Sequence, residues 1–397
     1  MRIQQLRTLT FLFSLLFTGS WLMGQQTYEA KLTGYQETQT VLTEASGEIT
    51  ASLTGNVLTV TGQFQGLSSP VAPVAVTGTH IHAGLAGQDG GVELSLVPTL
   101  AVDSLSGSFS AIANTFTLSA NQLLALDQHG LYVNIHTVAH PAGEIRGQLL
   151  PNQSNTDYYM AELTGSSEFP RVYSTGGGKV VIAQNGNDIE VSGSFNQLEG
   201  DFDASIGGGA HLHLGLPGQN GGVEIPLQAT VDASLKSGIF IADSNTYTLT
   251  ANQRSALEKR NLYVNIHTTL HPSGEIRGQV MGMSQAIFRA HLSGAQEVPS
   301  TQSSGRGQLI AELDGSQLIV VGAFRDLDSD FDPGIGAHLH QALAGRTGGV
   351  EIALQSGQLL TSTVPEISRT TQLVKDIAAA SSEQSNGAEQ INNVIQN

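Results

Sequence analysis

Two histidines separated by a single residue occur three times in this chain of 397 residues. Each pair is followed by a glycine-rich turn and then by the sequence Gly-Gly-Val-Glu. Alternate residues of a β-strand point to the same face, so the two imidazoles of a pair would lie about 6–7 Å apart along one strand. This arrangement suits two ligands of one zinc or copper ion. The three pairs are His80 with His82, His211 with His213, and His338 with His340.

A second pair of histidines, with three residues between its members, follows in the first two of these copies. It could supply one or two further ligands to the same ion. Four histidines recurring in register, in a chain with only 12, indicate a metal site more strongly than an isolated pair would. The alternative is that the histidines hydrogen-bond loop backbones and stabilise a polar core. The additional candidate ligands are His136 and His140 in the first copy, and His267 and His271 in the second.

A glutamate and an arginine two residues apart follow each of these later pairs, within the motif Gly-Glu-Ile-Arg-Gly. We expect this motif to form an ion pair with the glutamate of the Gly-Gly-Val-Glu turn. Its own glutamate could instead bind the metal or orient a ligating histidine. Acid–base catalysis is a further alternative, but no nucleophile or second positioned carboxylate accompanies the motif. The residues concerned are Glu144, Arg146 and Glu93 in the first copy, and Glu275, Arg277 and Glu224 in the second.

These motifs belong to a long internal repeat. By their numbering, His211 follows His80 by 131 residues, and His338 follows His211 by 127 residues. A period of this length indicates tandem domains and excludes the short turns of a solenoid. We therefore divide the chain into repeat one (27–151), repeat two (157–282) and a truncated repeat three (286–355), which lacks the closing motif of the other two.

Within a repeat, short runs of alternating apolar and polar residues predict half-buried strands. Gly55-Asn56 predicts a tight hairpin turn. Ser119 with Gln122, and Thr250 with Gln253, have the spacing of a capping box and predict one short helix in each full repeat. The predicted fold is all-β: tandem antiparallel β-sandwich domains with a Greek-key-like order, each of about 125 residues with one short helix.

The two ends of the chain differ from the repeats. Residues 1–24 combine two arginines, an apolar run and small residues, which is the order of a secretory signal peptide. We expect the mature chain to have no transmembrane segment and to be secreted, periplasmic or on the cell surface. Residues 356–397 have apolar residues at helical spacing and predict a C-terminal α-helix with coiled-coil character.

The composition excludes several classes of partner and site. The chain has 34 acidic residues against 17 lysines and arginines, for a formal charge of −17. Nucleic acids and anionic membranes bind basic surfaces, so neither is an expected partner. The sequence contains no cysteine, which excludes disulfides, thiolate metal ligands and a cysteine nucleophile.

At these residues the chain resembles the CHRD domain, the module named after chordin. The matching pieces are the opening pattern A.L.G.QE, the His-x-His turn with Gly-Gly-Val-Glu, and the closing pattern YVNIHT…HP.GEIRGQ. The resemblance implies an all-β extracellular module, which in chordin is linked to the capture of growth factors. The run GTHIHAG is also similar to the copper-binding strand of Cu,Zn superoxide dismutases, which supports a β-sandwich with a metal-binding face.

The segment 356–397 resembles the coiled-coil signalling domain of methyl-accepting chemotaxis proteins, without the hairpin tip that contacts their kinase. A chimeric reading frame that cuts repeat three is our preferred account of this combination.

Together these observations predict an exported binding or adhesion-type module, and not an enzyme. Its expected partner is an extracellular protein or surface ligand of unknown identity, and copper or zinc is the candidate ion. Two alternatives remain: a metal-dependent oxidoreductase with a superoxide-dismutase-like histidine site, and signal transduction through the C-terminal helix.

Overall fold

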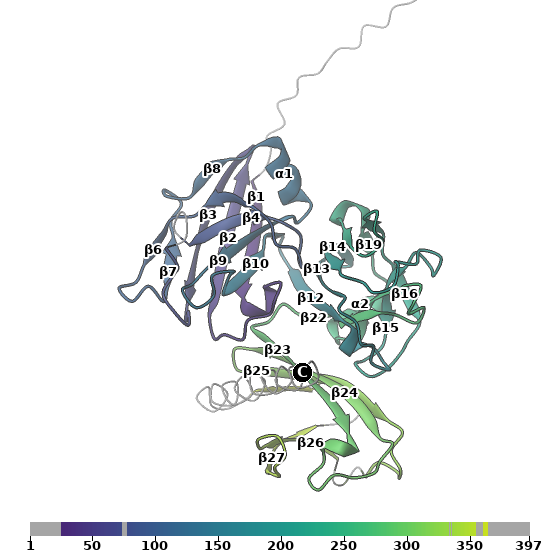
Figure 1. Cartoon of the computed structure of the whole chain (residues 1–397). Coiled ribbons are helices and arrows are strands. Elements are labelled where there is room, and N and C mark those ends of the chain that lie inside the picture. The colour runs from purple at the N-terminus through teal and green to yellow at the C-terminus, as the bar shows by residue number, and fades with distance from the viewer. Residues whose placement is uncertain (1–24, 74–77, 333, 335, 355–359, 364–397) are drawn as a thin grey trace, which may run out of the picture.

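The computed structural model describes residues 25–73, 78–332, 334, 336–354 and 360–363. The three repeats follow one another as three β-rich units, coloured from purple through teal to green in Figure 1. The predicted signal peptide at 1–24 and nearly all of the predicted helix at 356–397 lie outside the described residues.

Repeat one is a single antiparallel sheet in the order β5-β4-β9-β10-β1-β2-β3-β7-β6, with β11 paired to β1 and β8 paired to β3. The sheet curls so that apolar residues of β2 and β3 share one core with those of β4 and β9. Its elements are β1 (Gln26–Thr33), β2 (Ser46–Thr54), β3 (Val57–Gln65), β4 (Thr79–Ala83), β5 (Val92–Ser95), β6 (Pro98–Leu100), β7 (Gly107–Phe109), β8 (Thr115–Thr117), α1 (Ala120–Asp127), β9 (Leu131–Ile135), β10 (Ile145–Gln148) and β11 (Leu150–Pro151).

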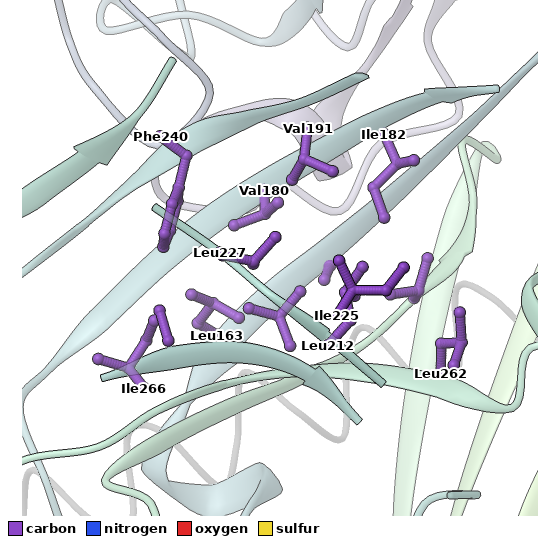
Figure 2. Packing of buried hydrophobic residues seen from close by; sticks show 14 of the residues in the cluster. Leu163, Val180, Ile182, Val191, Leu212, Ile225, Leu227, Phe240, Leu262 and Ile266 are labelled. Carbon is purple, nitrogen blue, oxygen red and sulfur yellow. The ribbon is translucent and has the colours of Figure 1, made fainter. Parts of the chain in front are cut away.

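Repeat two has the same order of elements and the same pairings. Figure 2 shows its core, in which Val180 and Val191 share one cluster with Leu212 and Leu262. The predicted tandem β-sandwich fold is therefore confirmed. The elements are β12 (Thr156–Thr164), β13 (Gly177–Asn185), β14 (Asp188–Asn196), β15 (Ala210–Leu214), β16 (Val223–Pro226), β17 (Ala229–Val231), β18 (Gly238–Phe240), β19 (Thr246–Thr248), α2 (Ala251–Glu258), β20 (Leu262–Ile266), β21 (Ile276–Gln279) and β22 (Met281–Gly282).

The local turn and cap predictions are also confirmed. Gly55 joins β2 to β3 with φ of 61°, in the left-handed region that favours glycine. Ser119 and Thr250 each accept a hydrogen bond from the backbone N–H three residues later, and the side-chain oxygen of the glutamine there accepts one from the cap backbone N–H. Each helix therefore begins at the residue that the capping box predicts.

Repeat three is built differently in the part of the chain that the structure describes. One sheet has the order β23-β24-β25-β28, and β26 pairs only with β27. Residues 360–363 form a strand on β25, so the helix predicted for 356–397 does not begin at this point, because the open edge of β25 pairs with them. The elements are β23 (Ala286–Ser293), β24 (Arg306–Asp314), β25 (Gln317–Arg325), β26 (Ala337–Gln341), β27 (Gly349–Leu354) and β28 (Leu360–Thr363).

Successive repeats pack head to tail through equivalent surfaces. His129 of repeat one lies 3.0 Å from Glu190 of repeat two. At the equivalent position of repeat two, Arg260 lies 2.9 Å from Glu312 of repeat three. In both cases the residue just after the short helix meets the outer face of the next repeat's first hairpin.

That outer face changes along the chain. Its central residue is Thr50 in repeat one, Val181 in repeat two and Ile310 in repeat three. Thr50 is half-buried, whereas Val181 and Ile310 are buried against the preceding repeat. A polar outer face on the first unit is typical of the terminal repeat of an array.

We predict that Thr250→Ala lowers the free energy of unfolding of repeat two by about 1 kcal/mol, because the cap hydrogen bond to Gln253 is lost. Thermal unfolding followed by circular dichroism measures the change. Ser255→Ala, in the middle of the same helix, is the control and should not lower the midpoint, since alanine is a better helix former than serine. An equal shift in both variants would contradict the prediction.

Candidate metal centre

The sheet register brings three histidines of each full repeat together. In β4, Ile81 points into the core, which places His80 and His82 on the opposite face. β9 pairs with β4 and positions Tyr132 opposite His82, and the chain continues from the end of β9 into His136. Repeat two repeats this arrangement on β15 and β20 with His211, His213 and His267.

In each group, one ring nitrogen from every histidine lies within 4.8 Å of the other two. In repeat one, the Nε2 atoms of His82 and His136 are 3.3 Å apart. Nitrogen ligands bound to one zinc ion at about 2.0–2.1 Å are themselves separated by roughly 3.4 Å. The spacing therefore fits a shared ion after small movements of the rings.

Backbone carbonyls fix the tautomers in repeat two. A carbonyl oxygen only accepts hydrogen bonds, so the ring nitrogen facing it must carry the proton. Gly207 O lies 2.8 Å from His211 Nε2, Gly221 O lies 3.1 Å from His213 Nδ1, and Pro272 O lies 3.0 Å from His267 Nδ1. The remaining nitrogens, one on each ring, are buried and have no hydrogen-bond partner. Three lone pairs thus face the same space.

Backbone carbonyls also fix the tautomers of two histidines in repeat one. His82 Nδ1 lies 3.0 Å from Gly90 O, and His136 Nδ1 lies 3.0 Å from Pro141 O. Their Nε2 atoms are therefore both acceptors, although they face each other at 3.3 Å. Two facing lone pairs repel, and a cation between them removes the repulsion.

Burial favours the neutral form of four of the six imidazoles. It lowers the pKa of His136 and of His213 to about 4, and it also lowers the pKa of His82 and His267. A metal ligand must be neutral imidazole, so these rings are ready to bind at physiological pH.

An aromatic and a cationic side chain support the first histidine pair. The Tyr132 ring stacks on His82 with an interplanar angle of 9° and a centroid distance of 5.1 Å. The Arg146 guanidinium lies 3.4 Å from the centroid of the Tyr132 ring. In repeat two, Tyr263 stacks on His213 and the Arg277 guanidinium lies over the Tyr263 ring in the same way.

The predicted ion pair between the Gly-Glu-Ile-Arg-Gly motif and the Gly-Gly-Val-Glu turn is wrong. Arg146 instead donates hydrogen bonds to the carbonyls of Leu85 and Gln88, because the loop after β4 folds over the guanidinium. Glu93 accepts a hydrogen bond from Gln122 of α1. In repeat two, Arg277 donates to Leu216 and Gln219, and Glu224 accepts from Gln253.

The glutamate of the Gly-Glu-Ile-Arg-Gly motif anchors neighbouring loops and does not belong to either three-histidine group. Glu144 is fully buried and accepts hydrogen bonds from the side chains of Thr43, Ser68 and Thr137. Glu275 does the same in repeat two with Ser174 and Thr268 and two backbone N–H groups.

Four of the ten predicted ligands are not gathered into these groups. His140 and His271 lie four residues after His136 and His267, in a turn beyond the end of the strand. The alternation of side chains along a strand stops there, so this spacing no longer places two histidines on one face. His338 and His340 stand on β26 with ring centroids 5.8 Å apart. No third histidine joins them among the described residues of repeat three.

Sequence reasoning missed a buried acid beside each centre. Glu37 and Glu168 are 4% exposed, and one oxygen of each has no hydrogen-bond partner. Burial raises the pKa of both to about 8. The glutamate that ends the opening motif of each repeat was the signal that could have found them.

We predict that Glu168→Gln stabilises the protein at pH 9 and has little effect at pH 4. The folded-state pKa of Glu168 lies near 8, above its ordinary value of 4.5, so folding is penalised progressively as pH rises from 4.5 through 8. An uncharged amide avoids that penalty. Thermal unfolding across this pH range measures the difference.

Glu275→Gln is the matched control of opposite sign. Burial alone would raise the pKa of Glu275, but hydrogen bonds from Ser174, Glu199 and Gly200 outweigh it and lower the pKa. This variant should lose stability at neutral pH. A stabilised Glu275→Gln, or a Glu168→Gln effect that is the same at pH 4 and pH 9, would contradict these assignments.

None of the helices in the described part of the chain is long and apolar enough to span a bilayer. Comparisons with curated proteins and with solved structures found no match. The family model of the CHRD domain matches three times, over residues 28–149, 159–280 and 288–392. The third match extends through residues for which we predicted a helix. These matches cover most of the sequence, and the chain therefore belongs to the CHRD domain family.

Proposed function

We propose that this chain is an extracellular binding module in which repeats one and two each hold one copper or zinc ion on three histidines. Membership of the CHRD family, whose members are typically extracellular, supports the class of function. The signal-peptide pattern at 1–24 and the excess of acidic residues support export and a partner that is neither nucleic acid nor membrane.

One observation carries the proposal: three buried and unpartnered ring nitrogens converge in repeat two. A buried acceptor without a partner costs about 1–3 kcal/mol, so three in one place are a substantial penalty for a purely structural cluster. Histidines that only anchor loops need a single hydrogen bond each, and His211, His213 and His267 already have it. A bound cation would use the second nitrogen of every ring.

His211, His213 and His267 would hold the ion in repeat two, and His80, His82 and His136 would hold it in repeat one. A bound zinc or copper ion would supply positive charge to the buried site and join β4 to the end of β9, and β15 to the end of β20. We propose binding as the function in preference to catalysis. The oxidoreductase alternative requires in addition that the ion be copper and change its oxidation state at the site.

Metal analysis of the purified full chain tests the proposal. After incubation with zinc or copper and desalting, we expect about two ions per chain by mass spectrometry, one for each three-histidine group. His213→Ala/His267→Ala should leave about one, because repeat one remains intact. His271→Ala is the matched control and should keep two, since this histidine lies outside the group. A folded wild-type chain that retains no ion would overturn the proposal.

A further inference from the structure

In each full repeat, the loop that hydrogen-bonds one histidine of the metal centre also contacts the next repeat. We call residues 84–90 and 215–221 the docking loops; they follow β4 and β15 directly. Each loop contains three glycines, two apolar residues and two polar residues. In both copies the loop contacts a histidine and its stacked tyrosine on one side and the first hairpin of the next repeat on the other.

The first docking loop, residues 84–90, contacts His82 and the tyrosine stacked on it in repeat one. Gly90 accepts the His82 ring proton through its carbonyl, and its N–H donates to the Tyr132 hydroxyl at 3.0 Å. Arg146 donates to the carbonyls of Leu85 and Gln88 at 3.0 and 2.8 Å. The position of this loop therefore sets both the tautomer of His82 and the stack beneath it.

The outer side of the same loop rests on repeat two. Ser194 Oγ donates to the Ala86 carbonyl at 2.8 Å. Gly87 lies so close that a Cβ atom there would be 2.8 Å from Ser194 Oγ and 2.9 Å from Lys179 N. Ala86 and Val181 are buried in one apolar cluster that joins the repeats.

Repeats two and three meet in the same way. A Cβ atom on Gly218 would lie 3.0 Å from Ala323 O and 3.1 Å from Gln308 N, on the first hairpin of repeat three. Gly221 in this loop accepts from His213 and donates to Tyr263. The close approach of the loop to the next repeat therefore recurs at the second boundary, whereas the Ser194 hydrogen bond does not, because Ala323 stands at the equivalent position.

We propose that Val181 and Ser194 are positioning residues for the histidine centre of repeat one, acting across the repeat boundary through the docking loop. The inference rests on the proposed metal-binding function. A glycine-rich loop has many conformations when free, and docking restricts it to the one that presents the Gly90 carbonyl to His82. Because the two events share one loop, each must favour the other by the same free energy.

The test uses the full chain with the centre of repeat two removed by His211→Ala/His213→Ala, so that only repeat one reports. Val181→Arg introduces a charge into the apolar cluster that contains Ala86 and should weaken zinc affinity about tenfold, within the usual range of such coupling. Ser194→Ala removes one hydrogen bond and should weaken it about threefold. Thr50→Arg places the same charge on the equivalent, half-buried position of repeat one and should change affinity less than twofold. Titration against a coloured zinc chelator gives the affinities.

A second readout separates positioning from a general loss of stability. Zinc bound at repeat one should slow hydrogen exchange of β13 and β14 in repeat two, and Val181→Arg should abolish this slowing. Unchanged zinc affinity in both Val181→Arg and Ser194→Ala would overturn the inference while leaving the proposed function in place. Failure of the parent chain to bind zinc or copper would instead overturn the proposed function, and the inference with it.

Discussion

The hydrogen bond from a histidine ring to a backbone carbonyl is the interaction on which the rest of this structure depends. It decides which nitrogen carries the proton, and so which nitrogen is free to bind. Gly207, Gly221 and Pro272 make this choice for the three rings of repeat two. These carbonyls belong to loops. The sheet therefore determines on which face the rings lie, and the loops determine which ring nitrogen is protonated.

The loops are held in turn by buried polar side chains that the sheet presents on the same face. Arg146 fastens the loop after β4, and Glu144 fastens the segments around Thr43 and Ser68. Both are almost completely buried, and each is satisfied by several partners. Such a network restricts the site to one arrangement, and the loss of one member leaves the others buried without partners. The head-to-tail packing of the repeats adds a further restraint on the docking loops.

The features of the fold that depend on the local sequence pattern could be predicted from the sequence. Strand alternation, the Gly55 turn and the cap at Ser119 involve neighbours in the chain, and all were predicted correctly. The side of the sheet that carries His80 and His82 followed from the same alternation. The partner of Arg146 and the exclusion of His140 could not be predicted, because both depend on how a loop folds back over the sheet. The strand at 360–363 likewise depends on pairing with residues 317–320, far earlier in the chain.

Ring nitrogen NMR of the metal-free protein tests the central claim most directly. With histidine labelled by ¹⁵N, the pattern of couplings distinguishes an Nδ1 proton from an Nε2 proton in each ring. We predict an Nδ1 proton on His213 and His267 and an Nε2 proton on His211, at neutral pH and before any metal is added. The same tautomers should persist when zinc is bound. Rings that exchange between both tautomers, or that carry the proton on the inward-facing nitrogen, would show that the loops do not prepare a binding site.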